Sequence, residues 1–131
     1  MKIDRLIQRA TQAYNNSYAP YSNFHVGAAV LDENGNIYDG CNVENAAYPS
    51  GSCAEQQAIG SMVANGGRII RHILITGVSN QPITPCGACR QRIREFADKE
   101  TLIHIHDQKR GLIKTYTIDE LLPDSFGPDN L

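Results

Sequence analysis

The spacing of hydrophobic and polar residues changes along the chain, from a helical repeat to short hydrophobic runs. In residues 3–16 hydrophobic side chains recur every three or four positions, which is typical of a helix with one buried face. Residues 26–31 and 37–38 are hydrophobic and flank a polar segment with Gly35, which can adopt a positive φ at low cost. The pattern therefore predicts an N-terminal helix followed by a β-hairpin.

Beyond the hairpin, helical and strand patterns alternate. A loop is expected at 41–52, and the elements expected after it are helices at 53–65 and 86–97, strands at 69–78, 102–106 and 113–117, and a helical turn at 118–122. This order is typical of an α/β fold in which helices cover one mixed sheet of about five strands. No repeat, low-complexity tract or linker is apparent, so we expect one domain spanning 1–131.

Composition and charge narrow the class of protein. The hydrophobic fraction of 41% and the charged fraction of 20% are ordinary for a globular protein. The net charge is −2, and no basic run offers the footprint that nucleic-acid binding needs, so a small-molecule substrate is favoured. Charged side chains interrupt residues 1–10, so we expect neither a signal peptide nor a membrane span, and cytoplasmic location is the default.

Three of the four cysteines fall where helices are expected to begin. Without a secretion signal, metal ligation is a better interpretation of these thiols than disulfides. Cys53 and Glu55 begin one helix, and Cys86 and Cys89 begin another. Unpaired N–H groups at helix starts favour the thiolate, which is the form that binds metal. Three thiolates would leave one position of tetrahedral zinc open, as in catalytic zinc sites.

The residues around these cysteines indicate a reaction. Zinc lowers the pKa of a bound water toward about 7, and Glu55 can lie over the open position without being a ligand. Cys-x-Glu followed by Pro-Cys-x-x-Cys matches the signature of zinc nucleobase deaminases, in which the glutamate carries protons. Residues 53–55 and 85–89 carry this signature.

Several separated motifs resemble one family. They are residues 18–24 (YAPYSNF), 40–48 (GCNVENAAY), the two cysteine motifs with Arg90 and Gln91, and 121–123 (LLP). In this order they resemble the small three-cysteine cytidine deaminases of pyrimidine salvage over nearly the whole chain. The resemblance implies a three-layer αβα fold, one Zn²⁺ per chain, and hydrolysis of cytidine and 2'-deoxycytidine to the uridine nucleosides and ammonia. Zinc-bound hydroxide would attack C4 while Glu55 shuttles protons.

The resemblance also implies substrate contacts. Asn42 and Glu44 would hydrogen-bond the ribose 3'-hydroxyl, Phe24 would stack on the pyrimidine, and the Ala54 N–H would hold the 2-carbonyl. The family is homotetrameric, with each site completed by neighbouring subunits. The side chains implied to reach a neighbouring site are those of Ala46, Tyr48 and Phe126.

One departure from the family concerns charge. Many relatives carry arginine directly after the Cys-Ala-Glu triplet, whereas this chain has Gln56. Zinc with three thiolates is net negative, and fewer nearby cations should weaken its Lewis acidity. Arg90, directly after Cys89, is the remaining candidate for hydrogen bonds to sulfur.

Other interpretations stay open from the residues alone. A related deaminase of an aminopyrimidine nucleoside such as blasticidin S would share the zinc motifs. A polynucleotide deaminase would need basic and aromatic contacts along a single strand. A non-catalytic, zinc-stabilised module would keep the fold without the reaction, and a fourth protein ligand would make the zinc purely structural. Phe24 could also be a core residue, and Asn42 and Glu44 a solvated loop edge.

The remaining cysteine and the histidines are expected to be structural. Cys41 borders a strand, and free cysteine is commonly buried. His104 and His106 share one face of a strand, but no third metal ligand is apparent near them. His25 and His72 are likewise expected to pack rather than to bind metal.

Overall fold

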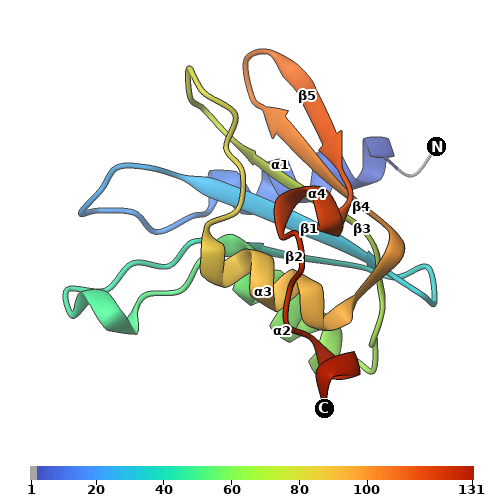
Figure 1. Cartoon of the computed structure of the whole chain (residues 1–131). Helices are drawn as coiled ribbons and strands as arrows, with labels where there is room; N and C mark the ends of the chain where they lie inside the picture. The colour runs from blue at the N-terminus through green and yellow to red at the C-terminus, as the bar shows by residue number, and fades with distance from the viewer. Residues whose placement is uncertain (1–2) are drawn as a thin grey trace.

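A five-stranded sheet in the order β2-β1-β3-β4-β5 is covered by helices on both faces (Figure 1). The computed structural model describes residues 3–131; residues 1 and 2, which belong to the predicted domain 1–131, lie outside the described residues. The elements are α1 (Ile3–Asn15), β1 (Val26–Asp32), β2 (Ile37–Cys41), η1 (Tyr48–Ser50), α2 (Ala54–Ala64), β3 (Ile70–Gly77), α3 (Gly87–Phe96), β4 (Ala97–Asp107), β5 (Gly111–Tyr116), α4 (Ile118–Leu121) and η2 (Pro128–Asn130). The predicted α/β fold with a mixed sheet is confirmed.

Strand directions place two helix starts at the same end of the sheet. β1 pairs antiparallel with β2 and β3, β3 pairs parallel with β4, and β4 pairs antiparallel with β5. Parallel neighbours need a crossover connection, which is provided here by α3. Because α2 leads back into the start of β3 and α3 follows its end, both helices begin near the end where β3 and β4 finish.

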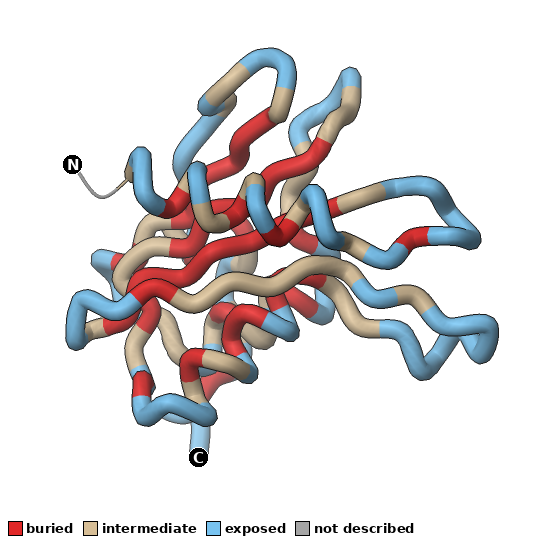
Figure 2. The backbone as a smooth tube through the Cα atoms, turned by 180° about the vertical axis from the view of Figure 1, so that it is seen from behind, coloured by how far each residue is buried: buried red, intermediate tan, exposed pale blue. Residues whose placement is uncertain are grey.

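Each face of the sheet has its own hydrophobic core. On one face, Leu6 and Ala10 of α1 pack with Leu31 and Leu74. On the other face, α2 lies over β1 and β2, and α3 and α4 lie over β4, around a core rich in isoleucines of β3 and β4. The burial map shows the same arrangement, with buried residues concentrated in the central strands and on the helix faces turned toward them (Figure 2). Within residues 3–131, no helix is both long and apolar enough to cross a bilayer.

Two glycines allow α1 and α2 to lie close against the hairpin. A Cβ at Gly27 would be 2.1 Å from the carbonyl oxygen of Ala10, and a Cβ at Gly40 would be 2.5 Å from the backbone nitrogen of Ala58. No side chain fits at these distances. The hairpin therefore holds a helix on each face through backbone contact, and α2, which begins next to Cys53, is fixed in this way.

Some elements differ from the sequence pattern. β4 begins at Ala97, directly after α3, rather than at 102, and its first part is exposed at residues 98–100. Pairing with β3 at Ile70 extends the strand there although the side chains lack hydrophobic alternation. Residues 41–52 contain η1 and two isolated bridges at Val43 rather than an unpaired loop. Cys41 ends β2 and is half-buried rather than fully buried as expected.

Three histidines form hydrogen bonds on the α1 side of the sheet. His72 stacks on His104 with ring centroids 5.2 Å apart, and their Nδ1 and Nε2 atoms are 2.9 Å apart. Nδ1 of His104 lies 2.8 Å from Oγ1 of Thr115, and Nδ1 of His106 lies 2.8 Å from Oγ1 of Thr76. These contacts agree with structural roles for the three rings.

Protonation of His104 is expected to destabilise the fold as the pH is lowered from 7 to 5. Burial lowers the pKa of His104 to about 4, below its unfolded value of about 6.5. The unfolded chain therefore binds more protons in this window, and the protein should lose about 2 kcal/mol through His104. Urea unfolding at both pH values should show a smaller loss for His104→Gln than for the unchanged protein. An identical loss in both proteins would contradict the prediction.

Candidate functional site

The starts of α2 and α3 carry the cysteines that the sequence singles out. Cys53 is the N-cap residue of α2 and Cys86 that of α3, both with extended backbone and neither with a side-chain capping hydrogen bond. Cys89 lies in the first turn of α3. Unpaired N–H groups and the helix dipole make both helix starts partly positive, which favours thiolates there.

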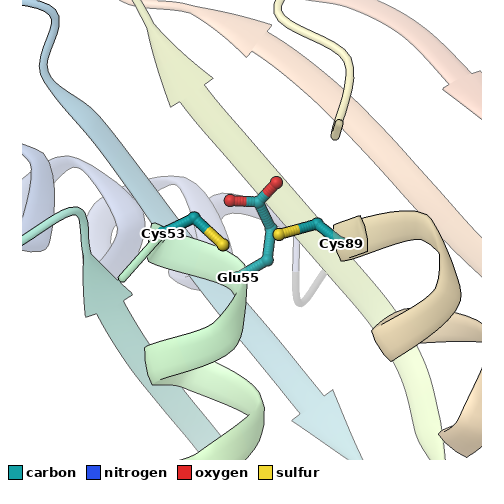
Figure 3. Close-up of side chains that lie close together, drawn as sticks. All are labelled: Cys53, Glu55 and Cys89. Carbon is teal, nitrogen blue, oxygen red and sulfur yellow. The ribbon is translucent and has the colours of Figure 1, made fainter. Parts of the chain in front are cut away.

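Cys53, Glu55 and Cys89 converge on one point. Their two sulfurs and a carboxylate oxygen all lie within 4.8 Å of one another, and the side chains point toward each other from α2 and α3 (Figure 3). Cys89 is fully buried, Glu55 is 5% exposed, and Cys53 is half-buried. In the described part of the chain, no other group of three His, Cys, Asp or Glu side chains comes this close.

The cluster holds its ionisable groups in unusual states. Burial raises the pKa of Glu55 to about 7, and the charge of Cys53 adds to this shift. The hydrogen bond between the two thiols lowers the pKa of Cys53 to about 6, while the same contact and burial raise the pKa of Cys89. A carboxyl group with a pKa near neutrality is well suited to accept and return a proton.

Cys86 stands apart from this cluster. Its side chain is exposed, and it is not one of the three residues within 4.8 Å of each other. Its charge nevertheless raises the pKa of Cys89, which lies one turn further along α3. The structure therefore brings together two of the three expected thiol ligands with Glu55, and the third ligand stays a prediction.

A cleft of about 510 Å³ opens beside Cys53. The residues that line it are Tyr21, Ser22, Asn42, Val43, Glu44, Asn45, Tyr48, Gly51, Ser52 and Cys53. Apolar atoms dominate its wall, and a few polar groups converge on it, as in sites for small molecules. The cleft thus connects the expected nucleoside-binding segments with the sulfur cluster.

Backbone hydrogen bonds join the segments that form the cleft. The Tyr18 N–H donates to the Asn42 carbonyl at 3.0 Å, and the Glu44 N–H donates to the Tyr18 carbonyl at 2.9 Å. Val43 and Ser52 exchange both backbone hydrogen bonds, at 2.9 and 3.0 Å. Residue 52 directly precedes Cys53, so the start of α2 is tied to the strand-like segment 42–44.

The side chains of Asn42 and Glu44 hold the segment 21–26 in place beside the cleft. Oδ1 of Asn42 accepts the Val26 N–H at 3.0 Å, and its Nδ2 donates to the Phe24 carbonyl at 2.7 Å. Oε1 of Glu44 accepts the N–H groups of Tyr21 and Ser22, both at 3.0 Å, and Oε2 accepts the Ser22 hydroxyl. These hydrogen bonds, the one from the Ser22 hydroxyl above all, lower the pKa of Glu44. Both residues line the cleft, and both side chains retain unused hydrogen-bonding capacity.

Of the other expected substrate residues, four are exposed and one is buried. Phe24, Tyr48 and Phe126 are 43%, 78% and 59% exposed, so none of them is a core residue, and Ala46 is exposed as well. Tyr48 meets Tyr21 edge-on, with ring centroids 6.3 Å apart. Ala54 is buried as the first residue of α2, where backbone N–H groups lack partners within the helix.

Known proteins match the chain over nearly all of its length. The sequence model of one protein family, the cytidine and deoxycytidylate deaminase zinc-binding region, matches residues 1–105. The chain belongs to this family. The cytidine deaminase of Sporosarcina psychrophila is 40% identical over 131 residues, covering 100% of this chain and 96% of the relative. The crystal structure of a cytidine deaminase from Burkholderia pseudomallei superposes with a TM-score of 0.89 at 39% identity, covering 96% and 100%. That of Mycobacterium tuberculosis superposes with a TM-score of 0.81 at 35% identity, covering 97% and 98%.

The donor set of this cytidine deaminase family member fits the zinc ion of its family. Two sulfurs and a carboxylate meet in one buried cluster, and thiolates are preferred zinc ligands. The Glu55 carboxylate is close enough to the sulfurs to lie beside a metal held there. The chain therefore carries a zinc-binding region, with one site.

The structure corrects the expected contact between Arg90 and the sulfurs. The Arg90 guanidinium donates to the carbonyls of Pro85 and Leu121, at 2.7 and 2.8 Å, and to Oγ1 of Thr84 at 3.2 Å. All three acceptors are oxygens, so Arg90 holds the loop that leads into Cys86. Arg92 contacts the sulfurs instead: its Nη1 lies 3.5 Å from Sγ of Cys89 and 3.8 Å from Sγ of Cys53.

The structure adds residues that the sequence pattern does not single out. Arg92 is the most important of them, and its position one turn after Cys89 is the signal that could have found it. Tyr21 and Ser22 line the cleft and bind Glu44. They lie within the motif at 18–24, so the motif marked the segment but not their contacts.

Proposed function

We propose that this chain is a zinc-dependent cytidine deaminase that hydrolyses cytidine and 2'-deoxycytidine to the uridine nucleosides and ammonia. One observation carries the proposal: the buried group of Cys53, Glu55 and Cys89 lies next to a nucleoside-sized cleft of which Cys53 is part. The family membership and the cytidine deaminases that match at 40% and 39% identity support it.

Cys53, Cys86 and Cys89 are the proposed zinc ligands. When bound, zinc would supply a nucleophile by lowering the pKa of a water molecule toward neutrality. The positive ends of α2 and α3 stabilise the thiolates. Arg90 holds the loop before Cys86 through the Pro85 carbonyl, which restricts where this thiol can move.

Glu55 is the proposed proton carrier. It accepts a proton from the attacking water as the C4–O bond forms and delivers that proton to N3. It then transfers the second proton to the amine, the C4–N bond breaks, and ammonia leaves. A pKa near 7 allows Glu55 to perform both transfers at neutral pH. Burial keeps bulk water away from the carboxylate while it acts.

Asn42 and Glu44, which line the cleft, are proposed to select a nucleoside together with Phe24 and Ala54. Asn42 and Glu44 would bind the ribose 3'-hydroxyl with their remaining hydrogen-bonding capacity, and Phe24 would stack on the base. The Ala54 N–H would bind the 2-carbonyl at the positive end of α2. A free nucleoside suits a cleft of about 510 Å³, and the net charge of −2 argues against a polynucleotide.

A second copy of the chain is proposed to complete each site. Tyr48, Phe126 and Ala46 are exposed although they belong to the substrate set implied by the family. A homotetramer with shared sites would cover them. The cytoplasm is the proposed location, since its reducing environment keeps metal-binding thiols reduced. We also propose that residues 1–131 act as one domain.

Release of ammonia from cytidine tests the proposed activity. The zinc-loaded protein should deaminate cytidine and deoxycytidine, whereas blasticidin S and a cytosine-containing oligonucleotide should be poor substrates. Preferential turnover of blasticidin S would replace the proposed substrate with the alternative one. No turnover of any nucleoside by protein with one zinc per chain would indicate a non-catalytic module.

Glu44→Gln is expected to weaken nucleoside binding while the cleft stays folded. Glutamine can still accept the Tyr21 and Ser22 N–H groups through its oxygen, but it loses the charged acceptor for the ribose. Loss of a hydrogen bond to a charged group should lower kcat/KM about 10- to 100-fold, mostly through KM. Glu33→Gln is the matched control, because Glu33 also accepts two backbone N–H groups, those of Arg68 and Ile69. An unchanged KM in Glu44→Gln would exclude ribose binding by this carboxylate.

A further inference from the structure

We infer that Arg92 is a positioning residue of the sulfur cluster. It bridges α2 and α3 at this cluster and supplies a positive charge there, which the uncharged Gln56 does not. This inference deepens the proposed function and rests on it, because it assumes that the cysteines hold zinc. Zinc binding by the unchanged protein tests the proposed function, whereas the difference between this protein and its Arg92 variants tests the inference.

The contacts of Arg92 carry the inference. Its Nη1 lies 3.5 Å from Sγ of Cys89, on its own helix, and 3.8 Å from Sγ of Cys53, which precedes α2. One nitrogen therefore contacts sulfurs from both sides of the site. Arg92 is half-buried, and it takes part in none of the salt bridges found within residues 3–131. Its guanidinium thus contacts the sulfurs without being tied up in one of those ion pairs.

Gln56 offers much less from the other helix. It is exposed and uncharged, and its Oε1 lies 4.0 Å from Sγ of Cys53. A carbonyl oxygen can only accept from a thiol, so it gives no hydrogen bond to a thiolate. Once Cys53 is ionised, the Gln56 amide could offer at most a neutral N–H, so the cationic donor at this sulfur from the side chains at 56 and 92 is the guanidinium.

Charge balance explains why a cation is needed. Three thiolates and Zn²⁺ leave the loaded site with a net charge of −1, and Glu55 adds a further negative charge when it is ionised. A fixed guanidinium offsets part of this negative charge, and its hydrogen bonds orient both sulfurs.

The space between the helices makes the position of this charge testable. Gln56 and Arg92 line the same groove, from α2 and α3 respectively, together with Ile59, Gly60, Val63, Gln91, Glu95 and Phe96. A long side chain at residue 56 can therefore occupy the same region as Arg92 without entering the core. The positive charge can be moved from one helix to the other.

Competition with a chromogenic zinc chelator on the zinc-loaded protein tests the inference. Arg92→Gln should lower the apparent zinc affinity about 10- to 100-fold, as loss of an outer partner of a metal ligand does. Arg92→Lys should keep part of it, because the charge remains although the fork of donors is lost. Arg5→Gln is the control for net charge, since Arg5 is exposed on α1, and it should bind zinc like the unchanged protein.

Relocation of the arginine is the decisive variant. Gln56→Arg introduced into Arg92→Gln should recover most of the lost zinc affinity. An affinity in Arg92→Gln equal to that in Arg5→Gln would overturn the inference, and so would a relocated arginine that recovers nothing. If the unchanged protein itself bound no zinc, the proposed function would fail instead.

Discussion

Replacement of Glu55 by glutamine is expected to remove nearly all cytidine deamination and to leave zinc binding and folding intact. Glutamine fills the same buried space but cannot accept a proton from water or return one to N3 and the leaving amine. One positioned carboxylate accounts for about 10²- to 10⁴-fold in rate, so kcat should fall by at least this factor. The measurements are kcat with cytidine, zinc per chain and the urea midpoint of unfolding.

The effect on stability separates a catalytic role from a structural one. Glu55 is 5% exposed, and a neutral amide there avoids the cost of burying a carboxylate. The unfolding midpoint of Glu55→Gln should therefore equal or exceed that of the unchanged protein. Glu100→Gln, at an exposed position of β4, should leave both activity and stability unchanged. Retention of more than about a tenth of kcat in Glu55→Gln would mean that another group carries the protons.

The helices and central strands could be predicted because their local patterns agree with their tertiary environment. The stripe of Leu6, Ala10 and Ala13 in α1 is buried, and the hydrophobic run of β3 lies in the middle of the sheet. The start of β4 could not be predicted, because its first residues are polar and exposed and are strand only through pairing with β3. The stacking of His72 on His104 likewise depends on the register of two strands, which no local pattern encodes.

The sulfur cluster could be predicted because its cysteines lie where helices begin. The arginine that contacts it could not be predicted by choosing the residue next to a cysteine in the sequence. Arg90 follows Cys89 directly, but consecutive helical residues point about 100° apart, and its guanidinium reaches Pro85 and Leu121. Arg92 is three residues from Cys89 and therefore on nearly the same helix face. The hydrogen bonds of Asn42 to residues 24 and 26 depend on how a distant segment returns to β1, which sequence spacing does not show.

Removal of a zinc ligand should be more damaging than removal of Arg92. Cys53→Ser and Cys89→Ser are each expected to reduce bound zinc to a small fraction of one per chain and to abolish turnover. Loss of an outer partner costs about 10- to 100-fold in affinity, and loss of a ligand should exceed this. Cys89 is fully buried beside Glu55, so serine there also leaves a smaller, poorly packed side chain. Zinc per chain is measured by atomic absorption after exhaustive dialysis.

Serine replacements of Cys86 and Cys41 decide whether three cysteines hold the zinc. Cys86 is exposed and lies outside the 4.8 Å cluster, yet the helix start and the Cys-x-x-Cys spacing predict that it is the third ligand. Cys86→Ser should therefore lose zinc as Cys89→Ser does, although an exposed side chain with only a packing role would tolerate this change. Cys41→Ser is the matched control, because Cys41 is a half-buried thiol at the end of β2 with no place in the cluster. Full zinc content in Cys86→Ser would exclude a site made of three cysteines, since only two thiols would then hold the metal beside Glu55.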